Sequence, residues 1–241
     1  IIFTCKRAMQ LDLLLRSIFK NFKNFKTPIY IINDFELSHK KSYSQIKKKW
    51  KNKIIIYNIN TKKIAKLKQL KKNKIYFLRA SNLFHNLRWK FFGFSNLKST
   101  LESILKNKIK NNFVTLMTDD TVVFKKNIIH NFVFQTLRKN PKNLFYKYCI
   151  DKNFIGLESI KNAYKLKSIK FKNKIFYNWK LRNNFFLRYN YFWNYRFSID
   201  ACIFDTKSLL NFLKPIFYSN PSNLESIGNK EAYLRGFFKF G

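Results

Sequence analysis

The chain has 241 residues, of which 46% are apolar, so it is long and apolar enough for one large α/β domain and is not intrinsically disordered. Its formal net charge of +37 would ordinarily indicate nucleic acid or an anionic membrane as a partner, but Lys outnumbers Arg 40 to 9 and the lysines are spread over the whole chain. We favour a compositional bias toward Lys, Asn, Ile and Phe as the origin of the charge, with a true anionic partner as the alternative.

The first quarter of the chain alternates between short apolar runs, which are typical of buried strands, and amphipathic segments, which are typical of helices. Apolar residues recur at helical spacing from Leu11 to Phe19, and Pro28 ends that segment. The order strand, helix, strand, helix, strand implies right-handed crossovers and therefore a parallel sheet. The predicted strands cover residues 1–4, 29–32 and 54–57, and the predicted helices cover residues 11–19 and 42–50.

The rest of the chain continues this alternation less regularly. Residues 61–75 are rich in lysine and favour a solvated helix face or a loop, while residues 151–190 favour loop and short strands. No internal repeat or Gly-, Ser- or Pro-rich linker interrupts the sequence, so we expect one domain over residues 1–241, as an excerpt of a longer chain. We predict helices over 84–110, 128–137 and 206–213, strands over 113–117, 144–146 and 197–204, and a turn into a short helix over 220–225.

The stretch from Phe113 to Phe124 is the first candidate for chemistry. Its apolar strand runs directly into Asp119 and Asp120, although two adjacent like charges repel each other. Ligands of an open α/β sheet lie beyond the carboxyl ends of its strands, so these acids are placed to hold a divalent metal ion and, through it, a phosphate. The plain alternative is that the two acids only end the strand and cap the next turn.

Four segments carry further motifs in order along the chain: IFTCKRAMQLDLLLRS at Ile2–Ser17, LMTDDTVVF at Leu116–Phe124, WNYRFSIDACIF at Trp193–Phe204 and NPSNLE at Asn220–Glu225. Together they resemble the GT-A fold nucleotide-sugar glycosyltransferases of the family 2-like, DxD-containing kind. The resemblance implies a Rossmann-like, mostly parallel central sheet flanked by helices. It also implies sugar transfer from a nucleoside-diphosphate sugar to a hydroxyl of a glycan or lipid-linked acceptor, with residues 1–125 binding the donor and residues 126–241 the acceptor.

On the donor side, the resemblance implies that Asp119, Asp120 and Thr121 hold Mn²⁺ or Mg²⁺, with Asp119 also contacting the donor. It places Thr4 and Arg7 against the base and the phosphates, and an arginine binds phosphate in a bidentate way that lysine cannot. Asn33 and Asp34 end the second predicted strand, so we expect them to face the same crevice and the nucleotide. The alternatives are that Arg7 is one more surface cation and that residues 33–34 form a simple turn.

On the acceptor side, Asp200 is the candidate general base, because an unpaired charge inside an apolar segment is costly without a function. Its alternative role is an ion pair with Arg196 or a nearby lysine. For Glu225 the alternatives are to position the acceptor or to cap the turn over residues 222–225, and we favour the cap. The sequence departs from the family pattern at Thr121, where a third acid is frequent, and at Ala201 and Cys202, which replace Gly-His.

These departures keep open a second function, a catalytically impaired binding protein with the same fold. The basic charge keeps open a weaker third candidate, a nucleic-acid-binding protein, although no binding motif is recognisable. Cys5, Cys149 and Cys202 lie far apart and indicate reduced thiols rather than a disulfide framework. No apolar run approaches the length of a membrane span. We therefore expect a cytoplasmic protein, with peripheral contact to the anionic inner membrane face as its membrane association.

Overall fold

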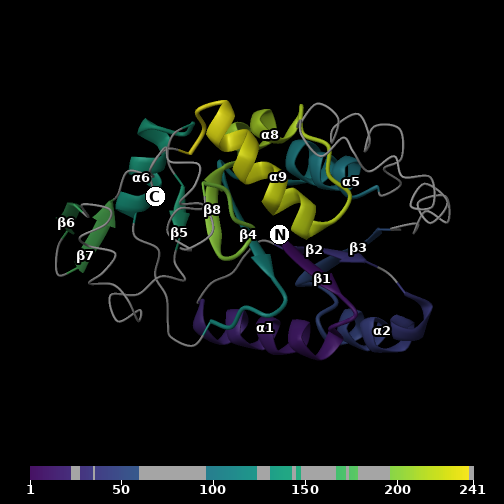
Figure 1. Cartoon of the computed structure of the whole chain (residues 1–241). Coiled ribbons are helices and arrows are strands. Elements are labelled where there is room, and N and C mark those ends of the chain that lie inside the picture. The colour runs from purple at the N-terminus through teal and green to yellow at the C-terminus, as the bar shows by residue number, and fades with distance from the viewer. Residues whose placement is uncertain are drawn as a thin grey trace, which may run out of the picture.

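The computed structural model describes residues 1–22, 28–34, 36–59, 96–123, 131–142, 145–147, 167–171, 174–178 and 196–238. Its centre is a six-stranded sheet of order β3-β2-β1-β4-β8-β5 (Figure 1). The first four strands of that order run parallel, while β8 runs antiparallel to both β4 and β5. This arrangement confirms the α/β class and the mostly parallel sheet of the predicted fold, and it is compatible with a Rossmann-like fold. The strands are β1 (Ile2–Cys5), β2 (Ile29–Asp34), β3 (Ile54–Ile59), β4 (Phe113–Thr118), β5 (Tyr146–Lys147) and β8 (Cys202–Asp205).

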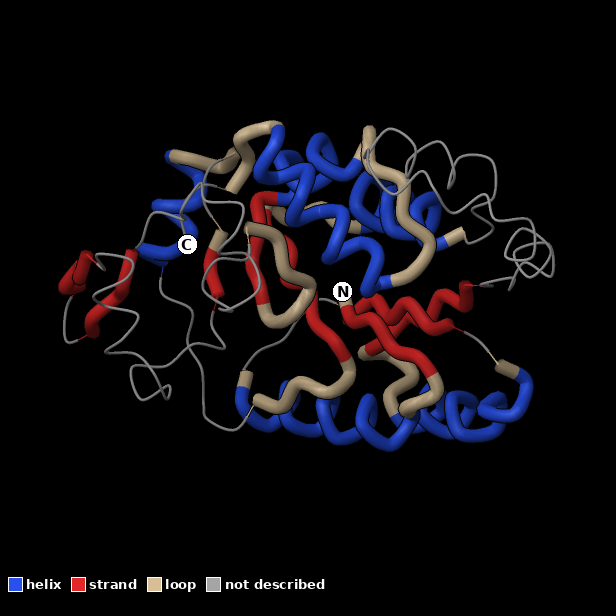
Figure 2. Tube along the Cα trace, in the orientation of Figure 1, coloured by secondary structure: helices blue, strands red, loops and turns tan. Residues whose placement is uncertain are grey.

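Helices cover both faces of the sheet (Figure 2). The pair α1 (Ala8–Asn21) and α2 (Lys40–Lys49) lies on one face, and α5 (Leu97–Ser103), α8 (Thr206–Leu213) and α9 (Pro221–Leu234) lie on the other (Figure 1). The π-helical turn η3 (Ile104–Lys108) continues α5, and the short 3-10 turn η1 (Leu37–His39) precedes α2. Helix α6 (Asn131–Lys139) packs near β8. A separate antiparallel hairpin consists of β6 (Lys167–Phe171) and β7 (Lys174–Asn178).

The two faces of the sheet have separate cores because neighbouring strand residues point to opposite sides. Ile2 and Ile31 pack with α1 and α2, whereas Phe3 and Ile32 pack with α5, α8 and α9. The second core is rich in phenylalanine, and its rings lie 5.0 to 6.4 Å apart between centroids. Truncating one such ring to Ala typically costs about 3–5 kcal/mol, so this aromatic core fixes α8 and α9 against β8. Its fully buried rings are Phe197, Phe204, Phe212 and Phe238.

Two predicted elements differ in the structure. The predicted strand over residues 197–204 is wrong for its first half: residues 197–201 bend, Ala201 has a φ of 49°, and β8 begins only at Cys202. The predicted short helix after the turn at residues 220–225 is instead the 14-residue α9, which begins with the side chain of Asn220 accepting a hydrogen bond from the Asn223 amide. Both differences arise from contacts between the bend and α9, which local sequence patterns do not reveal.

Several predictions fall outside the described residues. These are the lysine-rich segment over 61–75, the helical segment over 84–95, residues 128–130 of the helix now called α6, and most of residues 151–190. Within the described ranges, no helix is both long and apolar enough to cross a membrane.

Candidate functional site

A cleft of about 1170 Å³ lies at the carboxyl ends of the parallel strands. Its walls come from the loop after β1, the ends of β2 and β3, the turn after β4, the bend before β8 and the amino-terminal turn of α9. Parallel strands bring their carboxyl ends to one edge of a sheet, which is why residues distant in sequence meet here. The cleft brings together seven of the eight residues predicted from the sequence, namely Thr4, Arg7, Asp34, Asp119, Asp120, Thr121 and Asp200.

The cleft is acidic although the protein is strongly basic. The whole chain has only twelve Asp and Glu residues, and five of them line this one cleft: Asp34, Asp119, Asp120, Asp200 and Glu225. The described residues of the lining include one lysine, Lys6, and one arginine, Arg7. The described lining of the cleft therefore has a formal excess of three negative charges within a chain of net charge +37. Such a cleft attracts a divalent cation and repels an anionic ligand that arrives without one.

Asp119 is held by a directed chain of hydrogen bonds at the end of β4. Its carboxylate only accepts, so the Thr4 hydroxyl donates to Asp119 Oδ2 at 2.7 Å, and the Tyr43 hydroxyl in turn donates to Thr4 Oγ1 at 2.8 Å. The Asp119 side chain is only 6% exposed. Burial raises the pKa of its carboxyl, an effect that the Thr4 hydrogen bond and the Arg7 guanidinium partly offset. Thr4, predicted to contact the nucleotide, lines the cleft and also orients Asp119.

Arg7 bridges the two adjacent acids. Its Nη1 atom lies 3.3 Å from Asp120 Oδ2 and 3.6 Å from Asp119 Oδ1. The side chains of Arg7 and Asp120 are both about half exposed, whereas Asp119 is buried beneath them. A single guanidinium thus balances a pair of carboxylates at the mouth of the cleft.

Thr121 connects the turn after β4 to Asp200. Its hydroxyl donates to Asp200 Oδ1 at 2.6 Å, and the Thr118 hydroxyl approaches the same oxygen at 3.3 Å. The residue that departs from the family pattern therefore contacts the predicted general base. This hydrogen bond also places Asp200 within the same cleft as the acid pair, across 79 residues of sequence.

The bend that carries Asp200 is held by Glu225 of α9. Glu225 Oε1 accepts from the Ser198 hydroxyl at 2.7 Å and from the Ile199 amide at 3.4 Å, and Ser198 Oγ accepts from the Asp200 amide at 3.1 Å. The prediction that Glu225 caps the turn over 222–225 is wrong, since Asn220 caps α9. Glu225 instead positions the bend, and the sequence offered no signal for it because its partners lie 26 and 27 residues away.

Arg196, which with a nearby lysine was the alternative ion-pair partner predicted for Asp200, is buried, and its guanidinium lies 5.0 Å from the ring centroid of Tyr233. Burial lowers the pKa of the Arg196 guanidinium, with the Tyr233 hydroxyl opposing that shift. Arg196 therefore packs beneath the bend on an aromatic face.

Asn33 and Asp34 separate in the structure. Asp34 lines the cleft and accepts a long hydrogen bond of 3.8 Å from the Cys5 thiol. Asn33 is fully buried, and its Nδ2 donates to Asn58 Oδ1 on β3 at 3.1 Å. The described cleft lining therefore includes Asp34 but not Asn33. The two side chains separate because consecutive residues of a strand point to opposite faces of the sheet.

The donor set at the end of β4 fits a hard divalent cation. Among the described residues no group of three or more His, Cys, Asp and Glu side chains is arranged to hold a metal ion. Asp119 and Asp120 are a pair rather than such a group, and the Thr121 hydroxyl donates to Asp200 instead. Mg²⁺ and similar ions commonly take one or two carboxylates and complete their shell with water and substrate phosphates, so a pair in an open cleft suffices.

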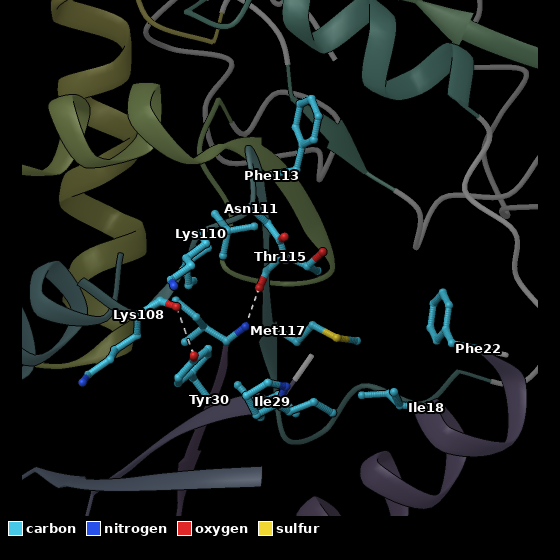
Figure 3. Close-up of a pocket in the computed structure, with 15 residues that line it drawn as sticks. Ile18, Phe22, Ile29, Tyr30, Lys108, Lys110, Asn111, Phe113, Thr115 and Met117 are labelled. Carbon is cyan, nitrogen blue, oxygen red and sulfur yellow. Dashed lines mark hydrogen bonds between the residues drawn. The ribbon is translucent and has the colours of Figure 1, made fainter. Parts of the chain in front are cut away.

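A second cavity of about 370 Å³ lies at the opposite, amino-terminal ends of β1, β2 and β4 (Figure 3). Its walls are mainly apolar, and two hydrogen bonds cross it: the Ile1 backbone nitrogen donates to the Thr115 carbonyl at 2.7 Å, and the Tyr30 hydroxyl donates to the Lys108 carbonyl at 3.2 Å. Its described lining contains no Asp, Glu, His or Cys. We therefore place the chemistry in the acidic cleft.

Comparison of the chain with protein-family models, with curated proteins and with solved structures found no match.

Proposed function

We propose that this chain is a glycosyltransferase that moves a sugar from a nucleoside-diphosphate sugar to an acceptor hydroxyl. The observation that carries the proposal is the concentration of five of the twelve acids of a basic chain in one cleft. The four motifs that resemble GT-A glycosyltransferases supply the reaction class. The mostly parallel sheet, with its cleft at the carboxyl ends of the strands, supports a fold of that kind.

Asp119 and Asp120 are the proposed ligands of Mn²⁺ or Mg²⁺. When bound, such an ion neutralises the diphosphate leaving group as negative charge builds on it. The excess of carboxylates in the cleft supports this requirement, because an unaccompanied diphosphate would be repelled there. Arg7 is the proposed phosphate contact, and Asp34, further along the same edge of the sheet, is the proposed contact of the nucleoside.

Asp200 is the proposed general base. In a direct displacement the acceptor oxygen forms a bond to the anomeric carbon, the bond from that carbon to the diphosphate oxygen breaks, and the acceptor proton passes to the Asp200 carboxylate. The Thr121 hydroxyl fixes one oxygen of that carboxylate at 2.6 Å, so the base has a defined orientation before substrate binds. Glu225 supports the same orientation through Ser198.

The proposed acceptor is a glycan or lipid-linked hydroxyl at the cytoplasmic face of the inner membrane. The net charge of +37 supports such a location, since it attracts anionic lipid headgroups over a Debye length of ~10 Å. This part of the proposal depends on the resemblance and on the charge rather than on the cleft.

A thermal-shift screen of nucleoside diphosphates and nucleotide sugars, with and without Mn²⁺, tests the donor. We expect one nucleotide to raise the melting temperature in the presence of Mn²⁺, because a ligand of the folded state stabilises it by mass action. Asp120→Asn should abolish that shift, whereas Glu231→Gln, which removes one carboxylate of α9 that does not line the cleft, should preserve it. No shift with any nucleotide would overturn the proposal.

The rate of sugar transfer from the nucleotide sugar identified in that screen tests the proposed role of Asp200 and the catalytic activity itself. Asp200→Asn should leave donor binding in place and lower the rate of sugar transfer by about 100-fold or more, in line with the loss of a general base. If donor binds but Asp200→Asn transfers sugar at the wild-type rate, Asp200 is not the base. If donor binds and the wild-type protein transfers no sugar to any acceptor, the catalytically impaired binding protein replaces the enzyme.

A further inference from the structure

Arg7 occupies the position that a cation would take at the acid pair. Its Nη1 atom lies between Asp120 Oδ2, at 3.3 Å, and Asp119 Oδ1, at 3.6 Å. The second oxygen of Asp119 already accepts from Thr4. The carboxylate oxygens at the mouth of the cleft are therefore shared with a guanidinium.

A divalent ion and this guanidinium compete for the same oxygens. Two cations on one pair of carboxylates repel each other strongly at distances of 3 to 4 Å, so an incoming ion displaces Arg7. The displacement is sterically open, because the Arg7 side chain is 52% exposed and borders a cleft of about 1170 Å³. Arg7 is the N-cap residue of α1, at the end of the loop from β1, and its side chain makes no capping hydrogen bond to the helix.

Lys6, the neighbouring cation, is engaged elsewhere. Its Nζ atom lies 2.5 Å from Glu36 Oε1, and that hydrogen bond raises the pKa of the Lys6 ammonium. Lys6 therefore has its own counter-ion, and in the part of the chain that the structure describes Arg7 is the cation paired with Asp119 and Asp120.

We propose that Arg7 is an exchangeable counter-ion that couples divalent-cation binding to diphosphate binding. The cation releases Arg7 from the acid pair, and the released guanidinium binds the diphosphate that arrives with the cation. Each ligand then raises the affinity for the other, since coupling between two sites is reciprocal. Without diphosphate, Arg7 holds the cation affinity down. The inference rests on the proposed function only in requiring a metal-bound diphosphate, not a sugar or an acceptor.

Manganese(II) and inorganic pyrophosphate are the probes, because they need no knowledge of the nucleotide. Free Mn²⁺ is measured by electron paramagnetic resonance during titration of wild-type protein, Arg7→Gln and the control Arg16→Gln. Arg16 also pairs with an aspartate, Asp12, at 2.8 Å, but on α1 and outside the cleft lining, so the control removes the same charge from the molecule. Circular dichroism spectra establish that all three proteins fold.

Arg7→Gln should bind Mn²⁺ alone on the order of tenfold more tightly than wild type, a change within the usual range of coupling between sites. The same variant should bind the Mn²⁺–pyrophosphate complex about tenfold or more weakly than wild type, because the guanidinium is lost as a phosphate ligand. Arg16→Gln should match wild type in both titrations. The two opposite shifts in one variant are the signature of an exchangeable counter-ion.

Two results would overturn the inference. If Arg7→Gln binds Mn²⁺ no more tightly than wild type, Arg7 does not compete for the acid pair, and the same holds if neither protein binds Mn²⁺. If the variant gains Mn²⁺ affinity but binds Mn²⁺–pyrophosphate as well as wild type, the guanidinium is not transferred to the diphosphate. Either result leaves the glycosyltransferase proposal to its own test, since that test measures the shift with a nucleotide sugar and the transfer of sugar.

Discussion

The role of Thr121 could be predicted only in part from the sequence. From the sequence it stands where a third acid is frequent, which predicts a weak metal ligand. The structure adds that its hydroxyl donates to Asp200 Oδ1 at 2.6 Å. That contact joins two segments 79 residues apart, so spacing along the chain could not have predicted it. Asp34, Asp119 and Asp120 were predicted because each ends or follows an apolar strand, and strand ends are readable from local patterns. Asp200 was instead predicted from the motif around it, since it lies in the bend before β8 and follows no strand.

Replacing Thr121 by Val tests whether this hydroxyl positions Asp200. The substitution keeps the shape and removes the donor, and a hydrogen bond to a charged group contributes about 1.5–3 kcal/mol, so we expect a roughly 10- to 100-fold lower kcat with little change in the donor KM. Thr121→Ser keeps the hydroxyl and should restore most of the rate. Steady-state kinetics of the three proteins measure both constants.

A loss of Mn²⁺ affinity in Thr121→Val, with Mn²⁺ binding restored in Thr121→Ser, would instead establish Thr121 as a metal ligand. An unchanged kcat in Thr121→Val would show that Asp200 needs no hydroxyl to hold it.

At the scale of elements, the strands and amphipathic helices of the first half lie close to where their apolar patterns predict them. The pattern misled at residues 197–201, whose alternation resembles a strand, because the backbone there bends to meet α9. The Phe197 amide donates to Asn229 Oδ1 at 3.1 Å, and Asn229 Nδ2 donates back to the Phe197 carbonyl at 2.6 Å. These contacts satisfy backbone groups that a strand would otherwise pair, and a one-dimensional pattern contains no trace of them.

Gly228 allows α9 to approach that bend closely. A Cβ atom at position 228 would lie 2.5 Å from Cδ1 of the buried Phe197 ring, closer than carbon atoms approach each other. Gly228→Ala should therefore lower the free energy of unfolding by about 1–3 kcal/mol through overpacking, despite the better helix propensity of alanine. Urea unfolding followed by circular dichroism measures the change.

Ser226→Ala, at an exposed position of the same helix, is the matched control and should change stability by less than about 0.5 kcal/mol. Equal or higher stability of Gly228→Ala would show that Phe197 yields to the added methyl group without loss.

At the scale of the molecule, acidic residues are so few that the role of each one, in the cleft or in the fold, can be examined separately. Five line the cleft, and Asp12 illustrates a structural role for another. It receives hydrogen bonds from Lys49 Nζ at 2.8 Å, from Trp50 Nε1 at 2.9 Å and from Arg16 Nε at 2.8 Å, and it thereby ties α1 to the end of α2. The composition alone predicted a bias toward lysine but could not tell which acids serve the fold and which serve the site.

The pH dependence of the free energy of unfolding should reveal the contribution of the Asp12 carboxylate. Burial acts to raise the pKa of its carboxyl, but the hydrogen bonds from Lys49, Trp50 and Arg16 together outweigh burial, so the pKa is lowered in the folded state. A lowered folded-state pKa contributes stability above the unfolded-state value of about 4, and that contribution is lost as pH falls through the folded-state pKa. Asp12→Asn should lower the free energy of unfolding at pH 7 by about 1–2 kcal/mol.

The difference between wild type and Asp12→Asn should shrink below about pH 4, and urea unfolding at pH 7, 5 and 3 measures it. Glu36→Gln, in an exposed pair with Lys6, should change stability by less than about 1 kcal/mol and serves as control. A difference that stays constant down to pH 3 would mean that Asp12 contributes through packing rather than charge.

The pairing of β4 with β8 has a mechanical consequence for how substrates reach the cleft. Phe113 to Leu116 pair in register with Asp205 to Cys202, so the strand that presents the acid pair and the strand that follows Asp200 belong to one continuous sheet. The parts of the cleft proposed to bind the donor and the acceptor therefore cannot move apart about a hinge without breaking that ladder. For the proposed substrates, entry and exit would then depend on side chains and loops at the rim of the cleft, among them the half-exposed Arg7 after β1.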